Sequence, residues 1–492
     1  MRVFTGAAFA LLMATLIPLD PLKATTSCEG LTSLAFPDAT ITLAEIVERG
    51  PSDRAAVAHC RVTATLRPSS DSDIKIELWM PTANWNRRFQ AVGNGAFNGT
   101  INYPAMAVAL DRHYATASTD TGHAGGSASF AIGHPQKVID FGWRAVHEMA
   151  VASKKIIAAY YDAGPRFSYW NGCSAGGRQG MKEAQRFPAD FVGIIAGAPG
   201  LDWTGRAAQA VHVAQALQKS EDARLSSNAR RLVHAAVLQA CDLRDGVKDG
   251  IVDDPSRCTF DPGSLQCKAA ADASCLTPAQ VNTAKLLYSA QVHPGTKRRI
   301  AGLLPGSELG WTDMGWTASA RATGLDQFRF LVFKDAAWDV DRFNFATDAV
   351  RAEEADGDTI NALDPNLTAF VERGGKLIQY HGWSDPQISP GNSVDYYQRV
   401  VAAMGGVGKV QDAYRLFMAP GMAHCGGGEG PDTFDMVGAL EQWVEQGNAP
   451  RSDPRLTFDR RRRRPHAAAL SIPAGGDVQG RGKHTRRREL HL

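Results

Sequence analysis

The stretch Gly172-Cys173-Ser174-Ala175-Gly176-Gly177 decides the fold that we predict for this chain. It follows an apolar segment, Phe167–Trp170, that is typical of a buried strand, and it precedes a helical pattern over residues 177–187. A G-x-S-x-G sequence between a strand and a helix is typical of a nucleophile elbow, whose small residues let the chain turn sharply. The pattern therefore predicts that Ser174 is a nucleophile and that the amide of Ala175 binds an oxyanion.

Two later segments supply the partners that a serine nucleophile needs. Asp385 follows the predicted strand Lys376–Tyr380, and His424 follows the predicted strand Tyr414–Met418. In α/β-hydrolases the serine, the acid and the histidine occur in this order, on loops that leave the sheet. We therefore predict a catalytic triad of Ser174, Asp385 and His424. Taken singly, the aspartate is also explained as a turn residue before proline and the histidine as a surface-loop residue.

Strands and helices alternate at both ends of the chain, which predicts an α/β fold with a mostly parallel, doubly covered sheet. The alternation stops over residues 201–361, which contain four of the eight cysteines and several helical patches. We predict an α/β-hydrolase core whose first part covers residues 27–200 and whose second part covers residues 362–455. The residues between them are predicted to form a large inserted lid domain above the carboxyl ends of the strands.

The two ends of the chain have their own signatures. Arg2 precedes the apolar segment Ala7–Leu19, so residues 1–26 are predicted to be a signal peptide and the protein to be secreted or periplasmic. A buried N-terminal helix is the alternative, although two prolines interrupt it. Residues 456–492 are predicted to be a basic, disordered tail. An altered reading frame or binding to polyanionic surfaces also explains this tail.

The composition excludes several classes of protein. The 492 residues are 44% hydrophobic. They contain no run of about 18 apolar residues, which argues against integral membrane association. The formal net charge of +2 argues against nucleic acid as a partner. From Arg460 onward, ten basic and two acidic residues give +8, so the rest of the chain carries −6. The main body of the protein is therefore acidic.

The eight cysteines all lie after the predicted signal peptide, and an even number in an exported chain favours complete pairing. A zinc site is disfavoured because no C-x-x-C occurs and no histidines are grouped near the thiols. Cys173 directly precedes the predicted nucleophile and Cys425 directly follows the predicted base, so a bridge between them would hold the two catalytic loops together. Spacing alone leaves the connectivity open, but proximity suggests the pairs Cys241 with Cys258 and Cys267 with Cys275.

Three motifs together, over residues 172–177, 381–385 (HGWSD) and 421–425 (GMAHC), resemble the tannase and feruloyl esterase family, which includes mono(2-hydroxyethyl) terephthalate hydrolases. The resemblance runs from about Cys28 to Trp443. It implies a serine esterase that cleaves esters of phenolic or aromatic acids through an acyl-enzyme. This chain lacks both cysteines of a fifth disulfide that is common in the family. The resemblance implies the pairs Cys28 with Cys60, Cys173 with Cys425, Cys241 with Cys258, and Cys267 with Cys275.

The segment Cys241–Asp253 is rich in carboxylates that alternate with glycines, which suits a calcium ion because it takes six to eight oxygen ligands. It does not match the EF-hand pattern, and a solvated acidic turn is the alternative. The resemblance implies a structural Ca²⁺ in the lid, with its loop anchored by a disulfide. The implied ligands are the side chains of Asp242, Asp245 and Asp249 and the backbone carbonyls of Val247 and Ile251.

The remaining predictions concern the substrate. Gly95, in a glycine-rich loop after a strand, is predicted to supply the second oxyanion amide. His381 is predicted either to border the substrate pocket or to support the triad acid. Aromatic residues of the lid form the pool that would hold a phenolic ring: Trp311, Trp316, Phe328, Phe330, Phe333 and Trp338.

The predicted partner is a small aromatic ester, or one derived from plant cell walls or tannins; the oligomeric state stays open. Two other functions remain possible on this sequence. One is a different α/β-hydrolase, such as a serine peptidase, and the other is a non-catalytic, calcium-dependent carbohydrate-binding protein.

Overall fold

The computed structural model describes residues 26–48, 57–269, 272–450 and 470–471. The predicted signal peptide lies almost wholly outside these residues, as does most of the predicted basic tail. Among the described residues, no helix is both long enough and apolar enough to cross a membrane.

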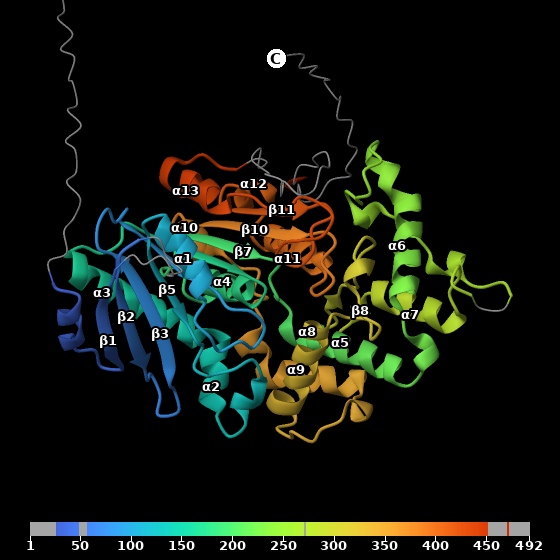
Figure 1. Cartoon of the computed structure of the whole chain (residues 1–492), viewed down its shortest axis with the longest axis horizontal. Coiled ribbons are helices and arrows are strands. Elements are labelled where there is room, and N and C mark those ends of the chain that lie inside the picture. Colours follow the sequence, from blue (N-terminus) through green and yellow to red (C-terminus); the bar gives the residue numbers. More distant parts are fainter. Residues whose placement is uncertain (1–25, 49–56, 270–271, 451–469, 472–492) are drawn as a thin grey trace, which may run out of the picture.

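A mixed sheet of ten strands forms the centre of the described structure (Figure 1). Its strand order is β1-β2-β3-β5-β4-β6-β7-β10-β11-β12. The strands are β1 Ala39–Val47, β2 His59–Leu66, β3 Ile74–Pro81, β4 Arg88–Val92, β5 Ala115–Thr119, β6 Phe167–Cys173, β7 Gly193–Gly197, β10 Lys376–Gly382, β11 Tyr414–Ala419 and β12 Leu470–Ser471.

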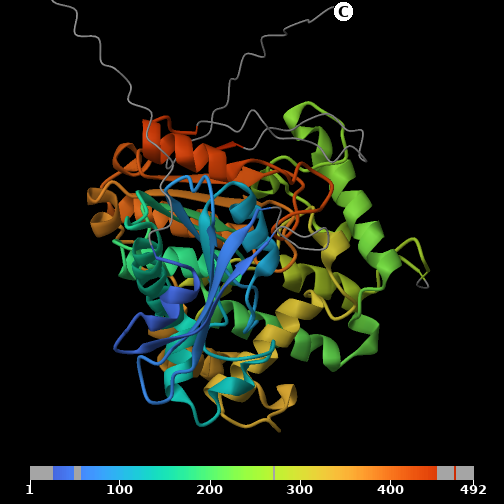
Figure 2. The ribbon, with the colours of Figure 1, turned by 60° about the vertical axis from the view of Figure 1, so that its left-hand side comes forward.

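The two halves of this sheet differ in strand direction. The strands β5, β4, β6, β7, β10 and β11 run parallel to one another, as the alternation of strands and helices predicted. The strands β1, β2 and β3 are antiparallel, and β3 is also antiparallel to β5. Figure 2 brings these first strands, in blue, to the front of the view. The prediction of a mostly parallel sheet is therefore right for the half that carries the predicted catalytic loops and wrong for the first half.

Helices cover both faces of the parallel strands. Consecutive residues such as Trp170 and Tyr169 belong to different apolar clusters, and the same holds for Ile194 and Ile195. Strands that are buried on both faces read as continuous apolar runs. The helices of the core are α1 Tyr103–Asp111, α2 Pro135–Ile139, α3 Ala145–Tyr161, α4 Ala175–Arg186, α10 Thr368–Glu372, α11 Pro390–Ala403, α12 Val407–Val410 and α13 Met436–Gln446.

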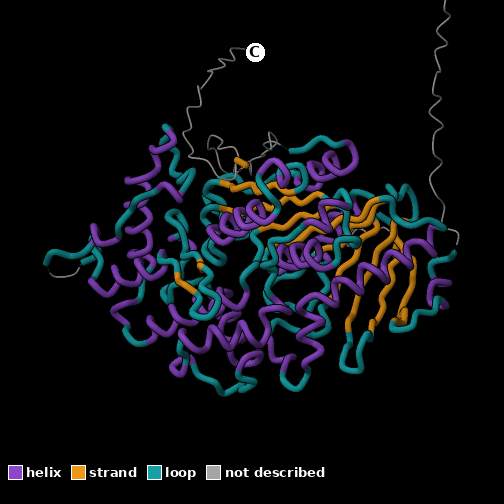
Figure 3. Tube along the Cα trace, turned by 180° about the vertical axis from the view of Figure 1, so that it is seen from behind, coloured by secondary structure: helices purple, strands orange, loops and turns teal. Residues whose placement is uncertain are grey.

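Residues 201–361 gather to one side of the sheet, coloured green to orange in Figure 1, and Figure 3 shows the same separation from behind. This segment has apolar clusters of its own, one of them around Trp311 and Trp316. Its role as a lid domain stays a prediction. Its elements are α5 Trp203–Gln218, α6 Ser227–Cys241, α7 Pro278–Tyr288, β8 Gln291–Val292, β9 Arg299–Ile300, α8 Ala318–Asp326 and α9 Phe345–Ile360.

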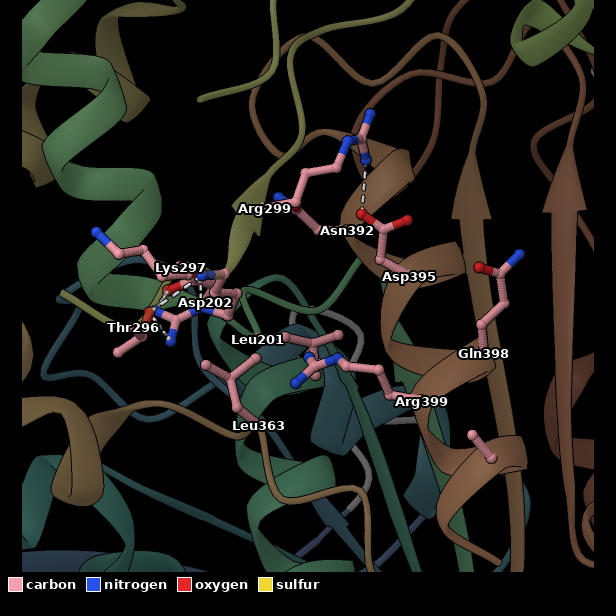
Figure 4. Close-up of a pocket in the computed structure, with 12 residues that line it drawn as sticks. Leu201, Asp202, Thr296, Lys297, Arg299, Leu363, Asn392, Asp395, Gln398 and Arg399 are labelled. Atoms are coloured by element: carbon pink, nitrogen blue, oxygen red, sulfur yellow. Dashed lines mark hydrogen bonds and ion pairs between the residues drawn. The ribbon is translucent and has the colours of Figure 1, made fainter. Parts of the chain in front are cut away.

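The start of α5 is fixed by an ion-pair network beside a cavity of about 650 Å³ (Figure 4). Asp202 caps the helix by accepting a hydrogen bond from the amide of Gly205. Arg298 donates two hydrogen bonds of 2.8 Å to the same carboxylate and one of 2.9 Å to Glu353. Two parallel donors on one carboxylate give a geometrically defined contact. The first turn of α5 is therefore held in place relative to β9 and α9.

Four disulfides are present, and the described cysteines include no free thiol. The two pairs suggested by proximity and all four implied by the family resemblance are confirmed. They join Cys28 to Cys60, Cys173 to Cys425, Cys241 to Cys258, and Cys267 to Cys275.

Candidate active site

Ser174 lies at the turn between β6 and α4, with backbone angles φ 65° and ψ −119°. A non-glycine residue rarely adopts such a conformation, and it is tolerated where the surroundings enforce it, often at functional sites. A Cβ atom on Gly172 would lie 2.6 Å from the carbonyl carbon of Gly176, so the turn needs glycine there. The sequence around Ser174 thus forms the sharp turn expected of a nucleophile elbow.

The loop after β4 packs directly against this elbow. The amide of Gly176 donates a 2.8 Å hydrogen bond to the carbonyl of Asn94. The side chain of Gln179, on α4, bonds both the amide and the side chain of Asn94. Gly95 directly follows Asn94, which these hydrogen bonds hold against the first turn of α4. This position suits the predicted role of the two amides as oxyanion donors, which stays a prediction.

Asp385 and His424 meet at the carboxyl ends of β10 and β11. Nδ1 of His424 lies 2.7 Å from Oδ2 of Asp385. The aspartate is completely buried, whereas the histidine side chain is 11% exposed. A buried carboxylate that binds one ring nitrogen fixes the tautomer and leaves Nε2 free for proton transfer. The structure therefore brings the predicted acid and the predicted base into the contact that a triad requires.

Both oxygens of the Asp385 carboxylate have hydrogen-bond partners. Its Oδ1 accepts hydrogen bonds from the amides of Gln387 and Ile388, at 2.7 and 3.0 Å. Burial alone would raise the pKa of Asp385, but the charge of His424 and the hydrogen bonds from His381 and His424 hold it well below its ordinary value. These contacts consequently favour the ionised form of Asp385.

His381 stands behind this carboxylate. Its Nε2 lies 3.0 Å from Oδ2 of Asp385, and its Nδ1 lies 2.7 Å from the hydroxyl of Ser393. The ring has no exposed surface. Of the two predicted roles, this position corresponds to support of the acid and does not correspond to lining of the pocket.

The disulfide between Cys173 and Cys425 joins the residue before Ser174 to the residue after His424. Its cysteines are 252 residues apart in sequence, and β7 and β10 lie between β6 and β11 in the sheet. A covalent link at this point limits how far the elbow and the histidine loop can separate.

Aromatic side chains pack around the start of α4. Phe97 and Trp203 belong to the same apolar cluster as Ala175, and their rings lie 5.1 Å apart. Phe330, from the predicted aromatic pool, packs against this cluster. The other members of the pool lie elsewhere: Trp311, Trp316, Phe328 and Trp338 are buried in the clusters of residues 201–361, and Phe333 packs on one of them. Neither Phe97 nor Trp203 belongs to the aromatic pool predicted from the sequence.

Comparison with known proteins identifies the family. The sequence model described as "Tannase and feruloyl esterase" matches residues 60–457. The chain belongs to the tannase and feruloyl esterase family. Members of this family are carboxylic ester hydrolases, and so is this chain.

Individual relatives match this chain over most of their length. An uncharacterised esterase of Xanthomonas campestris pv. campestris is 37% identical to this esterase, over 88% of this chain and 84% of the relative. Feruloyl esterase B of Aspergillus niger is 32% identical, over 82% of this chain and 80% of the relative. The crystal structure of feruloyl esterase B from Aspergillus oryzae superposes with a TM-score of 0.84 at 31% identity, covering 91% of this chain and 95% of that one. The predicted α/β-hydrolase fold is confirmed.

One group in the described part of the esterase has the spacing of metal ligands. The ligand atoms of His147, Glu183 and Asp190 all lie within 4.8 Å of one another. The carboxylates of the predicted calcium loop do not form such a group. There, Asp242 is buried and accepts hydrogen bonds from the amides of Asp249 and Gly250.

A histidine links the inserted segment of the esterase to the loop that carries His424. His234, on α6, lies 2.8 Å from Glu308 through Nδ1 and 2.9 Å from Glu429 through Nε2. Glu429 follows His424 by five residues. Burial lowers the pKa of His234, but the two carboxylates outweigh burial and raise it to about 9. The imidazolium thus holds α6 against the histidine loop.

The stability of the esterase is expected to depend on this histidine at alkaline pH. Because the pKa is raised on folding, the stabilisation is complete below about pH 6.5 and is lost as the pH rises through about 9. The melting temperature of the wild type should therefore fall more steeply from pH 7 to pH 10 than that of His234→Gln. Parallel melting curves for the two proteins would contradict this assignment.

Proposed function

We propose that this chain hydrolyses esters of phenolic or aromatic acids, of the feruloyl esterase or tannase type, with Ser174 as nucleophile, His424 as base and Asp385 as acid. The 2.7 Å contact between His424 and Asp385, linked to the elbow through a disulfide, carries the proposal. Membership of the family and the printed name of the Aspergillus niger relative, feruloyl esterase B, support the substrate class.

The reaction proceeds in two halves. Nε2 of His424 takes the proton of the Ser174 hydroxyl, and the oxygen attacks the ester carbonyl carbon. The amides of Ala175 and Gly95 donate hydrogen bonds to the oxyanion that forms. The proton then passes from His424 to the leaving alcohol, and an acyl-enzyme remains.

Water completes the cycle. His424 removes a proton from water, the hydroxide attacks the acyl carbonyl, and the Ser174 oxygen leaves with the proton that His424 returns. Asp385 stays ionised and stabilises the imidazolium in both halves. His381 and the amides of Gln387 and Ile388 orient the Asp385 carboxylate.

A panel of substrates tests the proposal. The purified protein should hydrolyse methyl ferulate, methyl gallate, chlorogenate or mono(2-hydroxyethyl) terephthalate with a higher kcat/KM than simple acetate esters. Equal rates on acetate esters and no preference for an aromatic acid would refute the substrate class. Cleavage of peptide amides in place of esters would refute the esterase itself.

We also propose that Asp242, Asp245 and Asp249, with the carbonyls of Val247 and Ile251, hold a structural Ca²⁺. Asp242 is a buried carboxylate, and no cationic side chain pairs with it within the described ranges. The pKa of Asp249 is raised by burial and by the charges of Asp242 and Asp245. A divalent cation would relieve the repulsion among these carboxylates, so the residues present fit a hard oxygen-binding ion.

Removal of calcium is expected to destabilise the protein. A ligand at about 100 times its Kd stabilises the folded state by about 2.7 kcal/mol, so a chelator should lower the melting temperature by several degrees and Ca²⁺ should restore it. Asp245→Asn should abolish this response, whereas Asp261→Asn, an exposed aspartate of the same segment, should retain it. A melting temperature that is insensitive to chelator and to added Ca²⁺ would rule the site out.

We propose that the protein is secreted or periplasmic. Four disulfides support an oxidising compartment, and the apolar segment near the N-terminus supports export.

A further inference from the structure

Two polar side chains on α5 are buried without a partner. Arg206 is 5% exposed and Gln209 is 1% exposed. Within the described ranges, Nε of Arg206 and Oε1 of Gln209 are closed off from solvent and have no hydrogen-bond partner. Buried polar groups nearly always have a hydrogen-bond partner. Two neighbouring groups without one therefore indicate a partner that the protein alone does not supply.

Other polar side chains of similar burial in this region are satisfied. The hydroxyl of Thr204 donates a 2.7 Å hydrogen bond to Glu353. The amide of Gln215, two turns further along α5, donates to the carbonyls of Val340 and Phe343. Arg178, a second fully buried arginine, donates to three backbone carbonyls, although its Nε is unpaired like that of Arg206. Along α5, which lies wholly within the described ranges, unpaired buried side-chain atoms occur only at Arg206 and Gln209.

Arg206 packs beside the candidate active site, and Gln209 lies on the same side of α5. Residues three apart on a helix lie on the same side. The guanidinium of Arg206 lies 5.4 Å from the ring of Trp203, which shares a cluster with Ala175. Burial lowers the pKa of Arg206 to about 10, and the charges of Asp385 and Asp202 act in the opposite direction. The contact with Trp203 places Arg206 beside the aromatic cluster that surrounds the elbow.

A third unpaired group lies in the apolar cluster that includes residues of α5. The indole Nε1 of Trp316 is buried without a hydrogen-bond partner among the described residues. Trp316 belongs to the apolar cluster that also contains Ala210 and Val213, which share the face of α5 that bears Arg206 and Gln209. The α5 face thus offers an N–H donor from Arg206 and both a donor and an acceptor from the amide of Gln209.

This combination of donors and an acceptor selects one chemical group. A carboxylate or a methyl ether only accepts hydrogen bonds, so the carbonyl oxygen of Gln209 would stay unpaired in either orientation of its amide. A phenolic hydroxyl accepts one hydrogen bond and donates another. We propose that Arg206 and Gln209 bind the ring hydroxyl of a phenolic acyl group, Arg206 by donating to its oxygen and Gln209 by accepting its proton. This inference rests on the proposed function and assigns specificity within it.

Two esters that differ only in the ring hydroxyl test the inference: methyl p-coumarate carries the hydroxyl and methyl cinnamate lacks it. The wild type should favour methyl p-coumarate by about tenfold or more in kcat/KM, because a site built for a hydroxyl discriminates against its absence. Gln209→Leu and Arg206→Met should each bring this ratio down to about one. Gln215→Leu, the matched control on the same helix, should keep the wild-type ratio.

Stability provides an independent readout. Because Gln209→Leu removes an unpaired buried amide, its melting temperature should equal or exceed that of the wild type. If Gln209→Leu lowered the melting temperature and reduced kcat/KM equally on both esters, the role of Gln209 would be structural and the inference would be overturned. Equal kcat/KM of the wild type on both esters would also overturn it while the proposed function stands. Failure of the wild type on both esters would refute the proposed function itself.

Discussion

Ser174→Ala is expected to lower kcat on methyl ferulate by about 10⁶-fold. In a serine hydrolase the removal of the nucleophile abolishes the acyl-enzyme route and leaves only binding and oxyanion stabilisation. The turn should survive, because its geometry depends on Gly172 and on the amide of Gly176 bonding Asn94. The measurement is kcat under saturating substrate, with circular dichroism as the check on folding.

Covalent labelling by a fluorophosphonate makes this result specific to one oxygen. The wild type should be labelled in a 1:1 ratio, and Ser174→Ala should not be labelled at all. Ser319→Ala, an exposed serine on α8, is the matched control and should label as the wild type does. Labelling of the Ser174→Ala variant, or failure of the wild type to label, would show that the elbow is not the reactive site and would favour a non-catalytic protein.

Asp385→Asn is expected to lower kcat by about 10⁴-fold, the cost of losing the carboxylate in a comparable triad. The reason here is geometric. Oδ2 faces ring nitrogens of His381 and His424, and Oδ1 faces the amides of Gln387 and Ile388. An asparagine must place its NH₂ group against one of these pairs, so an N–H donor would face other donors in either orientation.

The same clash predicts a lower melting temperature for Asp385→Asn than for the wild type, since a buried group loses its partners. Asp395→Asn, at a half-buried aspartate on α11 that pairs with Arg299, makes the same chemical change away from the triad and should retain activity. Both variants are compared by kcat on methyl ferulate and by thermal melting. Activity of Asp385→Asn within about tenfold of the wild type would remove Asp385 from the proposed triad.

The parts of the fold nearest the chemistry were the most predictable. The elbow is constrained to small residues around Ser174, and each catalytic loop follows a strand that is largely buried on both faces. Helix α3 was equally clear, because Val146, Met149 and Ala150 recur at helical spacing and are all buried. In these elements local pattern and tertiary burial agree.

The antiparallel half was not predicted, and the reason lies in its polar residues. Glu77, on β3, is buried yet charged, and it is satisfied by hydrogen bonds from Arg61 and Trp79. The register of β1 against β2 is interrupted between Ile41 and Leu43. A strand with a charged residue inside and a broken alternation has no clear period in the sequence.

The face of α5 was missed for a different reason. Arg206 and Gln209 interrupt an otherwise apolar helix face at positions three apart, which is a visible signal, but burial without partners is a property of the folded chain only. A search for polar residues on the apolar side of a helix that follows the elbow would have found them.

The Cys173–Cys425 disulfide also ties the relative positions of Ser174 and His424 to the redox state of their surroundings. Its two cysteines are 252 residues apart, so the link forms only after the chain has been made as far as Cys425. In a reducing cytosol the bridge would not persist, and Ser174 and His424 would be held together by packing alone. If the protein is exported as proposed, formation of this bridge in an oxidising compartment would complete the link between the two loops.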